Sequence, residues 1–289
     1  MKKTITILLL AAALLTACGQ GGNGTKESAT EEHGGHGGHK EKEGSEAGHE
    51  APAAGANEDV EASFSYSDTD NVQANKETTV TIQIQAADGK PYEQFETVHE
   101  KKLHLIVVSK DLSYFNHIHP EYEGNGKFTI ETAFPAAGDY KLIADFTLTG
   151  SEATNRSSWL TVKGEEAAAV PIVPYPEAEL TQTVDGKQVE LSFDQLTANK
   201  ELMLNFNISD AETKQPITDL QPYLGAIGHV VILSEDAENY LHVHPMEEKG
   251  SGPEAKFMTT FPHSGIYKIW GQFQRDGKVF TVPFVVEVP

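Results

Sequence analysis

The sequence contains an internal repeat, which limits the fold to two domains of one kind. Residues of matching type recur at an offset of 125: Pro91/Pro216, His104/His229, Ser109/Ser234, Asp111/Asp236, His117/His242 and Pro120/Pro245. Two residues are then added in the second half, and Phe134-Pro135 and Tyr140-Lys141 match Phe261-Pro262 and Tyr267-Lys268. Each half has roughly 100 residues, which is enough to bury a core without disulfide bonds.

Both halves show the alternation of polar and apolar residues that is typical of β-strands. The alternation is clearest in residues 78–85, which are also rich in β-branched side chains. Residues 103–108 are instead apolar on both faces, as expected for a strand inside a sandwich. Because helical periodicity is absent, we predict an all-β chain with two tandem β-sandwich domains.

Composition divides the chain into five segments. Residues after 18 are rich in Gly, Glu, Ala, Ser and Lys and predict a disordered tether, because they cannot bury enough apolar surface. Three prolines near residue 174 predict an interdomain linker. The predicted segments are a signal peptide (1–18), the tether (19–59), the first β-sandwich (60–163), the linker (164–176) and the second β-sandwich (177–289).

The N-terminus resembles a bacterial lipoprotein signal. Lys2 and Lys3 precede a short apolar run that ends in Leu15-Thr-Ala-Cys18. In lipoproteins with this signature the cysteine is acylated, so we expect Cys18 to attach the chain to membrane lipid outside the cytoplasm. An ordinary signal peptide is the alternative. Cys18 is the only cysteine, so an internal disulfide and a blue-copper centre are both excluded.

The formal charge argues against nucleic acid as a partner. The chain has 22 Lys and Arg against 43 Asp and Glu, and loss of Lys2 and Lys3 would change its charge from −21 to −23. Nucleic-acid binding needs a basic surface instead. An acidic surface keeps an exported protein soluble and raises the local concentration of cations.

Three histidines in each half have the spacing of a metal site. His104, His117 and His119 are repeated as His229, His242 and His244, with gaps of 13 (117−104 and 242−229) and 2 positions. If residues 103–109 and 114–119 form a hairpin in which Ser109 pairs with Tyr114, His104 lies opposite His119 and all three imidazoles share one face. The same register in the second half places His229 opposite His244. Structural histidines are the alternative.

Other candidate ligands are weaker. Asp145 and Gln272 are equivalent in the repeat, and Met246 follows the last histidine of the second copy. In the tether, His33, His36 and His39 are separated by glycine pairs, which allow several imidazoles to surround one ion. A solvated spacer is an equally good interpretation of these three. His99 and His263 have no counterpart in the other half and are left unassigned.

Imidazole nitrogen suits Cu(II) and Zn(II), so we expect copper or zinc as the bound ion. Cu(I) is less favoured, because the chain beyond Cys18 contains only three methionines: Met203, Met246 and Met258.

The motifs also resemble those of a family. Gly228-His229 with Tyr240-Leu-His-Val-His-Pro245, and Phe115-Asn-His-Ile-His-Pro120 in the first half, are similar to a Gly-His…His-x-His-Pro signature. It occurs in bacterial secreted proteins and lipoproteins with tandem immunoglobulin-like or cupredoxin-like domains. The resemblance covers most of residues 60–289 and implies a heavy-metal, especially copper, context. The first half departs from it at Val98-His-Glu-Lys101, where the second has Tyr223-Leu-Gly-Ala226.

We therefore predict a non-enzymatic, lipid-anchored metal-binding protein on the outer side of the cell membrane. It would buffer, sequester or deliver copper or zinc, with a metal transporter or exporter as its protein partner. A cell-envelope interaction module with structural histidines is the main alternative. A histidine-ligated metalloenzyme is the weakest, because no spacing marks a general base.

Overall fold

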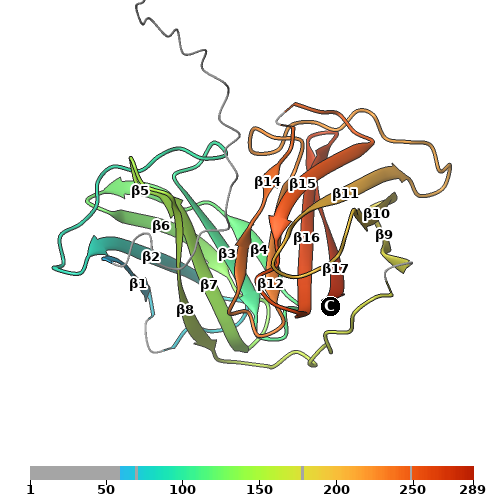
Figure 1. The fold of residues 1–289 in the computed structure, drawn as a ribbon. Coiled ribbons are helices and arrows are strands. Elements are labelled where there is room, and N and C mark those ends of the chain that lie inside the picture. The colour runs from blue at the N-terminus through green and yellow to red at the C-terminus, as the bar shows by residue number, and fades with distance from the viewer. Residues whose placement is uncertain (1–58, 69–70, 177–178, 248) are drawn as a thin grey trace, which may run out of the picture. The chain divides into compact units, whose positions relative to one another are not determined.

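The structure is a computed structural model that describes residues 59–68, 71–176, 179–247 and 249–289. These residues form two β-sandwiches joined by an extended segment, and they contain no α-helix (Figure 1). The prediction of an all-β chain is confirmed. Within the described part no helix has the length and apolar character needed to cross a bilayer.

The first domain contains eight strands: β1 (Val60–Tyr66), β2 (Glu77–Ala86), β3 (Leu103–Ser109), β4 (Phe115–Ile118), β5 (Glu121–Gly124), β6 (Lys127–Ala133), β7 (Gly138–Thr147) and β8 (Ala153–Val162). The second contains nine: β9 (Thr181–Val184), β10 (Lys187–Phe193), β11 (Glu201–Asp210), β12 (His229–Ser234), β13 (Tyr240–His242), β14 (His244–Pro245), β15 (Glu254–Thr260), β16 (Gly265–Arg275) and β17 (Lys278–Val288).

The order of the strands is that of an immunoglobulin-like domain. In the first domain the sheets are β1-β2-β6-β5 and β4-β3-β7-β8, and all pairs are antiparallel. The second domain repeats this order from β10 to β17, with β9 added at one edge. Immunoglobulin domains place strands A, B, E and D in one sheet and C, F and G in the other. Of the two sandwich types that the sequence suggested, this topology is the immunoglobulin-like one.

Each domain has its own hydrophobic core between its two sheets. In β3 the alternate residues Leu103, Leu105 and Val107 point into the first core, where they join Ile82 and Phe128. The second core is built in the same way around β12, with a group of packed phenylalanine rings: Phe206, Phe257, Phe273 and Phe284. Burial of these apolar side chains is the main force that stabilises each sandwich.

A tyrosine near the start of β7, and another near the start of the equivalent strand β16, fix the same corner in both domains. The hydroxyl of Tyr140 donates to the carbonyl of Ala136, and that of Tyr267 donates to the carbonyl of His263, each at 3.0 Å. Both tyrosines are 2% exposed. A hydroxyl that bonds back to the chain four residues upstream is the tyrosine corner of immunoglobulin-like sandwiches.

A third apolar cluster, which we call the interdomain cluster, joins the two domains. Its buried members come from both: Ile106, Val108, Leu112 and Ile143 from the first, and Val231, Leu233, Ala237 and Trp270 from the second. Phe115 stacks on Trp270 with ring centroids 4.7 Å apart. β3 is thus buried on both faces as predicted, but its second covering layer is the other domain.

The interdomain cluster has approximate two-fold symmetry, because equivalent residues of the repeat face one another. Ile106 corresponds to Val231, and Ile143 corresponds to Trp270. The equivalent lysines both reach the opposite domain: Lys141 forms an ion pair with Glu238 at 2.9 Å, and Lys268 donates to the carbonyl of Leu112 at 2.7 Å. The two domains therefore pack like the subunits of a symmetric dimer.

The tyrosine corners give a test of the fold. Tyr140→Phe and Tyr267→Phe each remove a donor and leave a carbonyl without its partner. We expect each change to lower the free energy of unfolding by about 1–2 kcal/mol, as measured by urea denaturation. Tyr175→Phe is the matched control, because Tyr175 is 40% exposed. Equal stability of all three variants would contradict a structural role for the corner.

Candidate metal centre

The β3–β4 hairpin places two histidines on the face that meets the second domain. Ile106 pairs with His117, and the N–H of Ser109 donates to the carbonyl of Tyr114 at 3.2 Å. Asp111 holds the turn, since it accepts from the hydroxyl of Ser109 at 2.6 Å and from the N–H of Ser113 at 3.0 Å. The predicted register is confirmed from Ser109 back to Leu105, which pairs with Ile118; the strand β4 ends there, before His119.

The second hairpin follows the same register only near its turn. Val231 pairs with His242, and the N–H of Ser234 donates to the carbonyl of Asn239 at 3.1 Å. Beyond His242 the chain crosses to the other sheet, where His244 in β14 pairs with Met258 in β15. The prediction that His244 lies opposite His229 is therefore wrong. The side chains of His242 and His244 are outside the described part of the structure.

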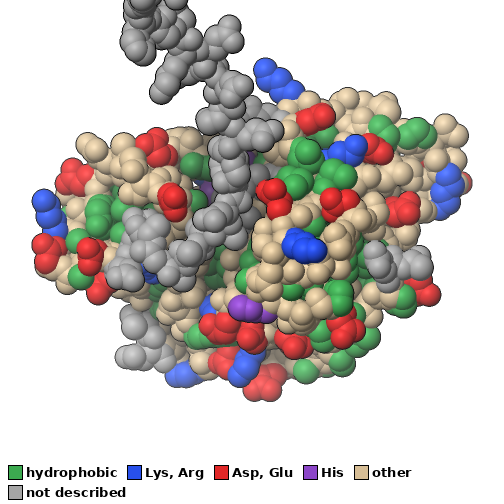
Figure 2. Space-filling model, viewed as in Figure 1, with side chains coloured by type: hydrophobic (Ala, Val, Ile, Leu, Met, Phe, Trp, Pro, Cys, Tyr) green, Lys and Arg blue, Asp and Glu red, His purple; other side chains and the backbone are tan. Residues whose placement is uncertain are grey.

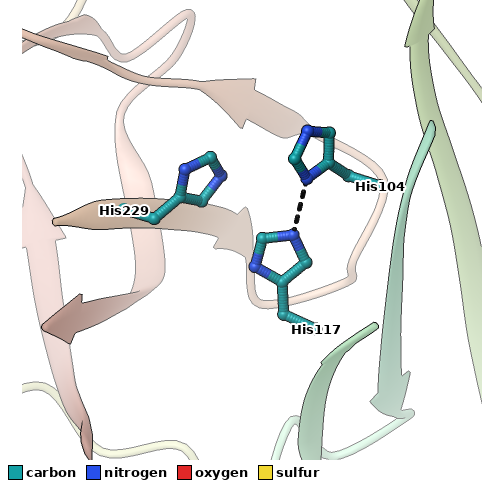
Figure 3. Close-up of side chains that lie close together, drawn as sticks. All are labelled: His104, His117 and His229. Atoms are coloured by element: carbon teal, nitrogen blue, oxygen red, sulfur yellow. Dashed lines mark hydrogen bonds between the residues drawn. The ribbon is translucent and has the colours of Figure 1, made fainter. Parts of the chain in front are cut away.

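Three buried imidazoles come together where the domains meet. Nitrogens of His104 on β3, His117 on β4 and His229 on β12 all lie within 4.8 Å of one another. The exposed fractions of these residues are 5%, 8% and 7%. Figure 3 shows the three rings turned toward one another from strands of both domains. The sequence predicted one triad in each domain, whereas this triad combines two residues of the first domain with one of the second.

Hydrogen bonds orient two of these rings. Nε2 of His104 lies 3.0 Å from the carbonyl oxygen of Val98, which can only accept, so this nitrogen carries the hydrogen. Nδ1 of His117 lies 2.7 Å from Oε1 of Gln272, whose amide nitrogen in turn donates to Thr281. Nδ1 of His104 and Nε2 of His117 form a hydrogen bond of 3.0 Å between the two rings, and the tautomers of the rings set its direction (Figure 3).

Burial keeps His117 and His119 neutral near pH 7. Removal from water, reinforced by the neighbouring His104, lowers the pKa of His117 from 6.5 to about 3. The same two causes, in the same order, lower the pKa of His119 to about 4. Near neutral pH His117 and His119 are therefore uncharged, and each keeps one ring nitrogen with a lone pair.

Further polar groups surround the triad. The ring of His119 lies 4.7 Å from that of His117 and 5.0 Å from that of His104. Its Nε2 is buried and has no hydrogen-bond partner among the described residues. Asp145 pairs with His104 across the strands, and its carboxylate accepts from the hydroxyl of Tyr240 at 2.7 Å. The nearby negative charge of Asp145 opposes the lowering of the pKa of His117.

Gly228 allows His229 to reach this position. A Cβ atom on Gly228 would lie 2.5 Å from Cδ1 of Phe273 and 2.8 Å from the carbonyl oxygen of Gln272. Only glycine permits such a close approach between the start of β12 and the neighbouring strand β16. The Gly-His pair in the sequence is thus explained by packing.

The other predicted site residues are not part of the triad. Met246 is 53% exposed, and Asp145 is not among the three residues whose donor atoms gather. Cys18, His33, His36 and His39 lie outside the described residues. In Figure 2, acidic side chains are spread over much of the visible face and little histidine shows.

Sequence reasoning missed two features of the centre. Gln272 is one of the weaker candidate ligands in the sequence, whereas in the structure it orients His117 from the opposite domain. His99 has no counterpart in the repeat to mark it, yet its ring lies 5.1 Å from that of His229. The apolar character of both faces of residues 103–108 was a signal for the second covering layer, and hence for a site shared by the two domains.

The solved structures that resemble this chain include several distant matches. Invasin, a bacterial integrin-binding protein, is 12% identical with a TM-score of 0.22, over 78% of this chain and 39% of its own. InvD of Yersinia pseudotuberculosis is 14% identical with a TM-score of 0.25, over 78% and 57%. This chain thus spans less than two thirds of either protein. A two-domain fibronectin type III segment of chicken tenascin is 11% identical with a TM-score of 0.22, over 78% and 97%.

Scores of this size give no information about function. Among curated proteins, none matches the chain. One family matches both halves, at residues 57–164 and 182–289, and it is described as Domain of unknown function (DUF8832). No metal-related family is among these matches. Because the two matches together cover most of the sequence, the chain belongs to the DUF8832 family and carries two copies of its domain.

Proposed function

We propose that this protein binds Cu(II) or Zn(II) in a histidine site shared by its two domains, and that it buffers, sequesters or delivers the ion outside the cytoplasm. The supporting observation is the triad of His104, His117 and His229, whose nitrogens lie within 4.8 Å of one another. Small rotations of the rings would let one ion contact all three.

The spacing of the two facing nitrogens matches that of ligands on one ion. Imidazole nitrogens that bind one ion at about 2.0–2.1 Å lie roughly 2.9–3.4 Å apart. Nδ1 of His104 and Nε2 of His117 are 3.0 Å apart. In the metal-free protein this contact is a hydrogen bond between the two rings, and a bound ion would take its place between the two nitrogens.

The surroundings resemble those of protein metal sites. Metal-binding histidines usually donate their other ring nitrogen to a carbonyl or carboxylate, which fixes the tautomer. Val98 and Gln272 do this for His104 and His117. Asp145 supplies a buried negative charge beside the cluster, which would offset part of the charge of a divalent cation.

The donor set favours copper or zinc over harder ions. Neutral imidazole nitrogens suit Cu(II) and Zn(II), whereas Ca²⁺ and Mg²⁺ prefer oxygen ligands.

Acylation of Cys18 would hold the site at the outer surface of the membrane, where a metal transporter or exporter would be the partner. The histidines of the tether would supply additional weak capture. If the protein binds no metal, a cell-envelope interaction module is the alternative.

Calorimetry with ZnCl₂ and CuCl₂ tests this proposal. The protein should span residues 19–289, with His33, His36, His39 and His49 replaced by serine to remove binding by the tether. We expect one ion per chain. We expect binding to weaken by about 100-fold in each of three variants: His104→Ala, His117→Ala and His229→Ala. Changes to residues that only orient a ligand already cost up to about this much.

His263→Ala is the matched control, because His263 is exposed and lies outside the cluster. Absence of binding by the parent protein would leave the envelope module as the function. Unchanged binding by His229→Ala, with loss in the other two variants, would restrict the site to the first domain.

The hydrogen bond from His117 to Gln272 gives a second test. Gln272→Leu removes the acceptor that orients the ring, and we expect metal affinity to fall by about 10–100-fold. Gln272→Glu keeps an acceptor and should bind at least as tightly as the parent protein. Equal affinity of the leucine and glutamate variants would show that the contact does not support the site.

The metal-free protein should lose stability as pH falls. In the unfolded chain histidines bind protons below pH 6.5, whereas folded His117 resists protonation down to about 3. The unfolded state therefore binds more protons in this range, so the free energy of unfolding falls as pH falls. Urea denaturation between about pH 7 and 5 isolates the effect, because carboxylates with pKa values near about 4 barely titrate there. His117→Gln should flatten the dependence, and an unchanged slope would contradict this explanation.

A further inference from the structure

The turn between Val98 and Lys101 belongs to the wall of the metal centre. The N–H groups of Val98 and Lys101 bond to each other's carbonyls at 2.9 and 3.0 Å, and the two residues between them have φ of 47° (His99) and 64° (Glu100). These are the marks of a type I′ turn. The carbonyl of Val98 accepts from His104, so this turn already orients one member of the triad.

The residues in this turn are unusual for its conformation. Type I′ turns favour Asn and Gly, because both central residues are left-handed. The equivalent turn of the second domain, Tyr223–Ala226, has Leu224 at 54° and glycine at 77°. The first domain places His99 and Glu100 there instead. A left-handed residue other than glycine costs on the order of 1 kcal/mol, and the two turns differ in this cost only at Glu100, because His99 and Leu224 are both left-handed.

The ring of His99 stands next to the triad. Its centroid lies 5.1 Å from that of His229, with an interplanar angle of 85°, and 6.3 Å from that of His104. Rings of imidazoles bound to one ion have centroids about 4.5–5.3 Å apart when adjacent and up to about 6.4 Å when opposite. His99 therefore lies at the spacing of an adjacent ligand from His229, whereas its ring would have to move toward His104 to join the three gathered nitrogens.

His99 stands beside the one ring of the triad that the second domain contributes. His119 is adjacent to His104 and His117, both in the first domain. His229 is the only member of the triad from the second domain. A four-coordinate ion needs its ligands distributed around it, and His99 provides the ring next to His229.

We propose that His99, presented by the strained Val98–Lys101 turn, is the fourth imidazole ligand of the shared metal centre. This inference rests on the proposed function and specifies its coordination. It also makes the centre asymmetric, because the second domain has Leu224 at the equivalent position and cannot supply a matching ring.

The test uses the full chain in detergent, with the tether histidines His33, His36, His39 and His49 replaced by serine. Electron paramagnetic resonance of its Cu(II) complex reports the number of bound nitrogens, and competition with a chromophoric chelator reports Zn(II) affinity. The double variant His99→Leu/Glu100→Gly reproduces the turn sequence of the second domain, so its turn has a precedent in this fold. We expect it to show one nitrogen fewer and Zn(II) affinity reduced about tenfold or more.

Glu100→Gly alone is the matched control, because it relaxes the turn and keeps the imidazole. It should leave both the spectrum and the affinity unchanged. An unchanged spectrum in the double variant would overturn the proposal, as would loss of a nitrogen in His119→Leu but not in the double variant. If the parent chain binds neither metal, the proposed function itself fails, which is a different result from either of these.

Discussion

Packing of the two domains through the outer faces of their β3 and β12 sheets is the interaction on which the candidate centre depends. It buries Ile106, Val108, Val231 and Leu233 in the interdomain cluster. Because neighbouring positions on the same strand faces are His104 and His229, the same packing removes the imidazoles from water. Without it, the rings of the two domains would be exposed and separate, and the pKa of His117 would not be lowered by burial.

The register of the first hairpin could be predicted from sequence because its turn has an even number of residues. Ser109 and Asp111 hold that turn, so the pairing of Ile106 with His117 follows from the positions of polar residues alone. The second hairpin was predicted correctly only as far as His242. After His242 the chain can pair with either sheet of the sandwich, and it joins β15 through β14. A local sequence pattern does not indicate which of the two sheets a strand joins.

The sharing of one centre by two domains could not be derived from the repeat. A repeated triad indicates two equal sites when each domain is considered by itself. Contacts such as His117 with Gln272 join residues far apart in the chain, and they arise only once the sheets are docked. The sequence of β3 did indicate that a second layer covers this sheet. Apolar residues on both faces of β3 need a covering layer on each side, and one sandwich provides only one.

The approximate two-fold symmetry of the interdomain cluster has a consequence for how such a centre can vary. Two identical subunits must place the same side chain at both symmetric positions, so any change appears twice. A chain that carries both halves is free of this restriction. Here Asp145 corresponds to Gln272, and His99 corresponds to Leu224. Covalent fusion of the halves thus lets one side of the interface specialise in charge or coordination while the other retains its packing role.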